Sequence, residues 1–160
     1  MPKVSRSRVI AADPQRAWDL VSDPHSLPRW WPRMLRVEDV DAGRGDGEEA
    51  TRWTAVLETE RGTGVRADYR RTELVRGRSY AWSQEIAGTP FERILRSSRL
   101  EIALRPEGAG TETEVSLTSD ETLRGLSRLG STMLRGAARR RLDDALDGIE
   151  RALVGSGDER

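Results

Sequence analysis

Residues 9–32, VIAADPQRAWDLVSDPHSLPRWWP, set the order of the first structural elements. Asp13 is a favourable N-cap, Pro14 suits the first position of a helix, and Ala17, Leu20 and Val21 follow at helical spacing. Three later prolines interrupt the pattern, so any second helix in this stretch must be short. The mixed run KVSRSRVIA overlaps its start. Together the two runs predict a strand, a helix, and a second short helix or turn.

Downstream of this stretch the sequence alternates between strand-like runs and glycine-rich turns. Strands are predicted at about residues 34–41, 50–60, 64–75, 79–87, 92–105 and 111–121. Because the turns are too short to hold crossover helices, we expect an antiparallel meander. Apolar residues at helical spacing then predict one long C-terminal helix over about residues 131–154. The fold class is therefore α+β.

Composition and charge restrict the classes of function. The chain of 160 residues has no cysteine, which excludes disulfides and thiolate metal sites. Its 27 basic and 27 acidic residues balance, which argues against nucleic-acid binding through global positive charge. No apolar run reaches the length of a signal peptide or a membrane span, so we expect a soluble, cytoplasmic protein. One domain is expected over residues 1–154, followed by a disordered tail at 155–160.

Three segments resemble the START and polyketide cyclase superfamily, also called SRPBCC. These are the 9–32 stretch quoted above, GAGTETEVSLTSDE at 108–121 and LDDALDGIERAL at 142–153. The resemblance to bacterial polyketide cyclase/dehydrase-like proteins implies a helix-grip fold, in which a curved seven-stranded antiparallel sheet wraps around the C-terminal helix. The superfamily includes aromatase/cyclases and carriers of lipids and quinones. It therefore implies a cavity for a small hydrophobic ligand, with no cofactor.

Alternation along the predicted strands selects the side chains that face such a cavity. The long helix would add residues near its start, where small and flexible side chains leave room opposite the aromatic residues. The predicted ligand-binding residues are Trp31, Trp53, Tyr69, Tyr80, Trp82, Gln84, Arg96, Ser98, Met133, Leu134 and Ala137. The alternative is that these residues form an ordinary core.

Trp30 and Trp31 are adjacent, and consecutive residues in a helical turn point about 100° apart. The two indoles therefore need separate roles. We expect Trp30 to close the core beside Trp18, and Trp31 to lie at the cavity mouth or in ordinary surface packing.

The functional alternatives differ in what the polar residues do. In a binding protein, Arg96 and Tyr69 would orient an oxygen-rich ligand. In a polyketide aromatase/cyclase or dehydratase, Arg96 would stabilise an enolate oxygen and Tyr69 would shuttle a proton. Alternatively, Arg96 lies at a strand end or bulge, where it reaches solvent or an acidic neighbour such as Glu73 or Glu92. His25, the only histidine, is expected to be a solvated turn residue, so no metal site is predicted.

Residues 124–141 form an arginine-rich segment without any acidic residue. Its members are Arg124, Arg128, Arg135, Arg139, Arg140 and Arg141. One interpretation is a binding surface for anionic lipid head groups or for an acidic protein partner. The other is a solvated helix face. The oligomeric state is left open.

Overall fold

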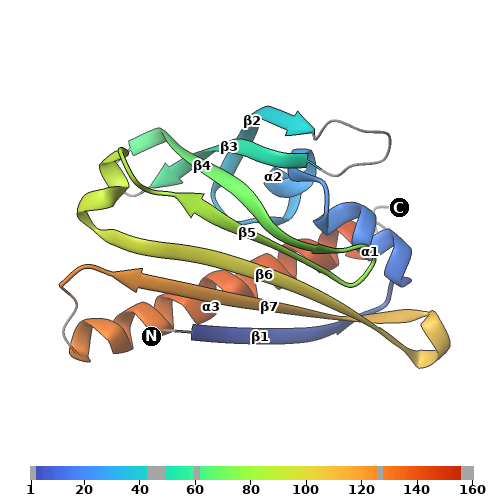
Figure 1. The fold of residues 1–160 in the computed structure, drawn as a ribbon. Coiled ribbons are helices and arrows are strands. Elements are labelled where there is room, and N and C mark those ends of the chain that lie inside the picture. The colour runs from blue at the N-terminus through green and yellow to red at the C-terminus, as the bar shows by residue number, and fades with distance from the viewer. Residues whose placement is uncertain (1–2, 43–49, 60–61, 126–127, 156–160) are drawn as a thin grey trace.

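A computed structural model describes residues 3–42, 50–59, 62–125 and 128–155 (Figure 1). The helices are α1 (Pro14–Val21), α2 (Leu27–Trp30) and α3 (Arg128–Leu153), and the 3-10 helices are η1 (Pro24–Ser26), η2 (Pro90–Arg93) and η3 (Gly108–Gly110). The strands are β1 (Lys3–Ile10), β2 (Met34–Ala42), β3 (Ala50–Thr59), β4 (Gly62–Val75), β5 (Ser79–Glu85), β6 (Leu95–Glu107) and β7 (Glu112–Leu123). The expected tail at 155–160 lies outside the described residues except for Gly155.

The seven strands form one antiparallel sheet in the order β1-β7-β6-β5-β4-β3-β2. Strands β2 to β7 form the predicted meander, and β1 adds beside β7. The sheet curves along α3, which runs beside β1 and β7 (Figure 1). This arrangement confirms the α+β class and the helix-grip architecture.

The start of α1 follows the sequence signals. Asp13 caps the helix, because its side chain accepts a hydrogen bond from the backbone N–H of Arg16 at 3.0 Å. Pro14 occupies the first turn, where a missing N–H costs nothing. The apolar face of α1 is then buried, with Ala17 and Val21 almost inaccessible to solvent.

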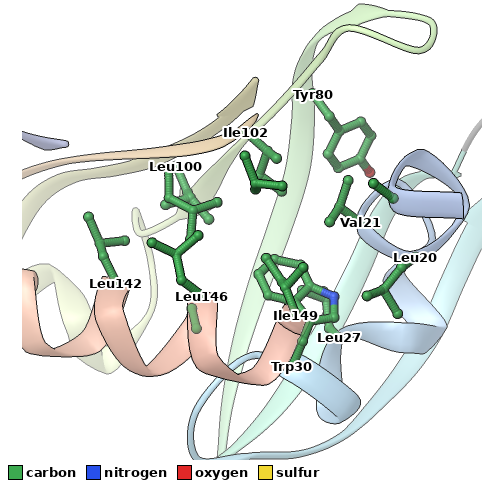
Figure 2. Packing of buried hydrophobic residues seen from close by; sticks show 14 of the residues in the cluster. Leu20, Val21, Leu27, Trp30, Tyr80, Leu100, Ile102, Leu142, Leu146 and Ile149 are labelled. Atoms are coloured by element: carbon green, nitrogen blue, oxygen red, sulfur yellow. The ribbon is translucent and has the colours of Figure 1, made fainter. Parts of the chain in front are cut away.

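The core lies between the sheet and one face of α3. Figure 2 shows Leu142, Leu146 and Ile149 of α3 facing Leu100 and Ile102 of β6. Trp30 and Leu27 of α2 complete the core at the C-terminal end of α3. Each of these aliphatic and aromatic side chains contributes on the order of 1.5–3 kcal/mol through burial.

Gly148 sets how closely α2 approaches α3. A Cβ atom at this position would lie 2.3 Å from the carbonyl oxygen of Trp30 and 2.8 Å from its Cα. Only glycine allows the backbone of α2 to rest directly on α3 at this point. The adjacent tryptophans are therefore fixed in place by a residue in the last helix.

The inward direction predicted for Arg96 is wrong. The strand predicted at 92–105 begins only at Leu95, because residues 90–93 form η2. A register shift between Leu95 and Ser97 then reverses the alternation, so Leu95 is buried while Ile94 is 58% exposed and Arg96 faces solvent. Arg96 therefore lies on the outer face of the sheet.

The start of α3 also differs from the expectation. The helix begins at Arg128, and its buried face is centred on Ala138, Leu142 and Ala145. Met133 is 69% exposed and Ala137 is exposed, while Leu134 is half-buried. The helical period was right, but the side of the helix that meets the sheet is turned away from Met133 and Ala137.

Candidate functional site

A cavity of about 260 Å³ opens between the concave face of the sheet and α3. The strands form most of its wall. Helix α3, the 3-10 helix η2 and the segment that follows α2 form the rest. The lining residues are Trp31, Pro32, Arg33, Met34, Trp53, Leu57, Glu58, Tyr69, Trp82, Gln84, Phe91, Leu95, Ser98, Arg99, Leu100, Ser119, Glu121 and Arg141.

The register of the strands builds one side of the cavity. Trp53 of β3 is opposite Tyr69 of β4, which is in turn opposite Gln84 of β5. The rings of Trp53 and Tyr69 stack, with centroids 6.1 Å apart and planes 16° apart. Trp82, two residues before Gln84 on the same face, meets Trp53 edge to face at 5.6 Å. The result is a continuous aromatic wall.

The two adjacent tryptophans have separate positions, as predicted. Trp30 is 2% exposed in the core, whereas Trp31 lines the cavity and meets Trp82 edge to face at 6.2 Å. The cause is a helix end: Trp31 has extended backbone angles (φ −81°, ψ 130°) because it precedes Pro32. The chain turns out of α2 at this residue, so only Trp31 reaches the cavity, while the two indoles still meet edge to face at 5.8 Å.

Tyr69, Glu121 and Arg141 bring polar groups to the cavity wall. Arg141 of α3 forms an ion pair with Glu121 of β7, and both residues line the cavity beside Tyr69. Burial, together with the negative charge of Glu121, raises the pKa of Tyr69 to about 12, although Arg141 acts in the opposite direction. Tyr69 is therefore a neutral phenol at physiological pH.

The cavity wall carries hydrogen-bond donors that have no acceptor. Within the described part of the chain, Trp53 Nε1, Gln84 Nε2 and Arg141 Nε are buried and lack a hydrogen-bond partner. An unsatisfied buried group costs about 1–3 kcal/mol. No acceptor atom of a described lining residue is left buried and unpaired in the same way. The wall thus favours a guest that brings acceptor oxygens.

Six of the eleven predicted binding residues meet in this cavity: Trp31, Trp53, Tyr69, Trp82, Gln84 and Ser98. Tyr80 instead belongs to the core, where it is 1% exposed. Met133, Leu134, Ala137 and Arg96 do not line the cavity, for the reasons of helix orientation and strand register given above. The cavity position predicted for these residues is therefore wrong, and for two of them the alternatives hold: Tyr80 is ordinary core, and Arg96 lies at a bulge and faces solvent.

Sequence reasoning missed Glu121 and Arg141. The alternation of β7 places Val115, Leu117 and Ser119 on the inner face, and Glu121 continues that row. Arg141 follows Ala138 by three residues on the inner face of α3. The alternation of β7 and the helical spacing of α3 are both visible in the sequence. The arginine-rich segment, however, gives no local reason to separate Arg141 from its neighbours.

Four other members of that segment do not line the cavity. Arg124, Arg135, Arg139 and Arg140 are exposed, and the side chain of Arg128 lies outside what the structure describes. A lipid or protein surface on this segment stays a prediction. His25 is exposed in η1, and among the described residues no three His, Asp or Glu side chains gather as a metal site.

No helix in the described ranges is long and apolar enough to cross a membrane.

Comparison with known proteins gives a family and a fold. Residues 1–154 match the family described as polyketide cyclase / dehydrase and lipid transport. The search of curated proteins gave no match.

Three solved structures illustrate the shared fold. A START superfamily protein from Mycobacterium smegmatis has a TM-score of 0.76 at 14% identity, covering 94% of this chain and 96% of its own. The protein XoxI from Bacillus cereus gives 0.73 at 17%, covering 99% and 100%. The di-domain ARO/CYC BexL from the BE-7585A biosynthetic pathway gives 0.73 at 20%, and the match covers 94% of this chain and 46% of BexL.

Proposed function

The chain belongs to the polyketide cyclase / dehydrase and lipid transport family, and we propose that it binds a compact aromatic molecule in the cavity beneath α3 without altering it. The proposed ligand is apolar over its ring surface and carries acceptor oxygens.

The aromatic wall is the observation that carries this proposal. Trp31, Trp53, Tyr69 and Trp82 present ring faces and edges to one space, which suits a flat apolar guest. The volume of 260 Å³ lies just below the range of about 300–1,000 Å³ found for ligand pockets. It suits a fused-ring compound better than a lipid with two acyl chains.

The unpaired buried donors of the cavity wall are the reason for proposing that the ligand carries acceptor oxygens. A carbonyl, ether or phenol oxygen near Trp53 Nε1 or Arg141 Nε would satisfy a group that has no partner among the described residues. Because each such group costs about 1–3 kcal/mol when unpaired, pairing it upon binding adds to affinity.

Calorimetric titration with 4-(2-naphthyl)butan-1-ol, a neutral probe, tests the proposal. We expect saturable binding of one probe per chain. Leu57→Trp fills the cavity from β3 and should abolish binding, whereas Val75→Trp, at a position 53% exposed on β4, should leave it unchanged. Equal binding by both variants, or no binding by the unmodified chain, would contradict the proposal.

The second candidate is a polyketide aromatase/cyclase or dehydratase, favoured by the grouping of Tyr69, Glu121 and Arg141 in one cavity. In an aldol closure, Arg141 would stabilise the enolate oxygen, in the role that the sequence suggested for Arg96. Because the pKa of Tyr69 is about 12, its phenol is protonated at neutral pH and would donate a proton rather than remove one.

Product analysis separates the two candidates. The chain is incubated with a synthetic poly-β-ketone thioester, and cyclised or dehydrated products are sought by mass spectrometry. Product that disappears in Tyr69→Phe and Arg141→Gln, while both variants still bind the naphthyl alcohol, would establish the enzyme. Recovery of unchanged thioester would support the binding protein.

A further inference from the structure

The sheet splits next to the cavity. Strands β5 and β6 pair from Ser79↔Ala103 only as far as Ser83↔Arg99. Beyond this point β5 stays paired with β4 through Glu85, and β6 stays paired with β7 as far as Leu95. A gap in the hydrogen-bond ladder therefore lies between Gln84 on one side and Ser98 on the other.

A groove of about 390 Å³ lies at this gap. Its wall is formed by Arg70, Ser83, Gln84, Ile86, Ala87, Arg96, Ser97, Ser98, Arg99 and Asp120. Three of these residues, Gln84, Ser98 and Arg99, also line the cavity. The inner cavity and the groove thus share a wall at the place where the ladder is interrupted.

The groove is rich in positive charge that is not neutralised locally. Its wall contains three arginines and one acidic residue, Asp120. Arg99 binds Glu73 at 2.7 Å and Glu101 at 3.3 Å, but Arg70 and Arg96 form no ion pair with any residue that the structure describes. Both are exposed, so their guanidinium groups are available to an anion.

We propose that the gap between β5 and β6 is an opening of the cavity, and that Arg70 and Arg96 at its outer side bind the acidic head group of an amphipathic ligand. The apolar ring of this ligand occupies the cavity, and a carboxylate or phosphate reaches the arginines through the gap. The inference rests on the proposed binding function. It gives Arg96 a ligand-binding role on the outer face of the sheet, whereas the sequence suggested a role on the inner face.

Gln84 occupies the key position in this opening. It lines both hollows, and its Nε2 has no hydrogen-bond partner among the described residues. A side chain without such a bond can change rotamer without breaking one, so Gln84 can move aside for a linear chain.

Matched probes with one ring and one chain test the head-group site. The probes are 4-(2-naphthyl)butanoic acid, 4-(2-naphthyl)butyl phosphate and the neutral 4-(2-naphthyl)butan-1-ol. In low salt we expect the better of the two acids to bind about fivefold more tightly than the alcohol, and the difference to shrink in moderate salt. The ratio between the two acids identifies the preferred head group.

The double variant Arg70→Gln and Arg96→Gln should remove the preference for the acids while the affinity for the alcohol stays unchanged. Arg78→Gln, at an exposed position just before the other end of β5, is the control and should keep the preference. If the double variant retains the preference for the acids, the head-group inference is wrong but the proposed function is unaffected. Failure of every probe to bind would overturn the proposed function as well.

The path through the gap is tested by thiol trapping, because the chain contains no cysteine. Ser97→Cys and Arg78→Cys each place one thiol outside the cavity, the first in the groove. With 4-(2-naphthyl)butyl methanethiosulfonate, the thiolate displaces methanesulfinate and forms a mixed disulfide. We expect Ser97→Cys to be labelled faster than Arg78→Cys. Excess naphthyl alcohol, which competes for the cavity, should reduce the Ser97→Cys rate to that of Arg78→Cys. Equal rates without the alcohol would refute the path.

Discussion

Substituting Gly148 by alanine tests the contact that positions the tryptophan pair. The new Cβ would lie 2.3 Å from the carbonyl oxygen of Trp30, whereas ordinary contact begins at 3.4 Å, so the shortfall is 1.1 Å (3.4 − 2.3). Rotamer changes cannot relieve this contact because both atoms belong to fixed parts of helices. One helix must therefore shift by about 1 Å, and such overpacking typically costs about 1–3 kcal/mol.

Alanine also favours a helix over glycine by about 0.5–1 kcal/mol, so the clash is partly masked. Gly136→Ala supplies the matched control, since it is in the same helix and its Cβ would meet nothing within 4 Å. Gly136→Ala should raise the free energy of unfolding by that propensity gain alone. Gly148→Ala should then be less stable than Gly136→Ala by about 1–3 kcal/mol.

Urea unfolding followed by far-UV circular dichroism measures both variants under the same conditions. Unchanged m-values would show that the comparison reports stability and not a change in the denatured state. If Gly148→Ala is as stable as Gly136→Ala, α2 does not press on α3 at this point, and the account of how Trp30 and Trp31 are held is wrong.

Three further predictions concern single side chains. Trp31→Ala should weaken binding of the naphthyl alcohol in calorimetry with little loss of unfolding free energy, and equal losses of both would contradict a role in the cavity wall. Thr113→Val should lower the free energy of unfolding by about 1–3 kcal/mol, because it removes the buried hydrogen bond from Thr113 Oγ1 to the carbonyl oxygen of Ala12; an unchanged urea midpoint would refute this. Tyr69 should ionise with a pKa of about 12 in an absorbance titration of the folded chain, and Tyr69→Phe should remove that step. Since this pKa is raised on folding, the linked stability is present below about pH 10 and is lost as the pH rises towards 12, and a step near 10 would refute the burial of the phenol.

Strand alternation was sufficient to predict the aromatic side of the cavity. Trp53, Tyr69 and Trp82 lie on strands whose register is regular at those residues, so the period of two alone gives their direction. The same rule failed at Arg96, because one extra residue in β6 reverses every side chain before it. A bulge of this kind has no strong signature in a single sequence.

The helix side of the cavity was harder to predict. Periodicity identifies the apolar stripe of α3, but the sheet covers only part of the helix, and Met133 lies on the uncovered part. Arg141 has the appearance of a surface residue until Glu121 is known to form an ion pair with it in the cavity wall. Ion pairs between distant elements depend on tertiary packing, which local sequence patterns do not contain.

The free edge of the sheet at β1 bears on how copies of this chain behave towards one another. Arg6 and Arg8 share the inner face of β1 with the buried Val4 and Ile10, and they reach across to Asp143 and Asp147 of α3. Charged side chains that point inward from an edge strand discourage a second strand from pairing there, since that neighbour would have to cover them. The charges that fasten α3 to the edge of the sheet thus also oppose edge-to-edge aggregation at β1.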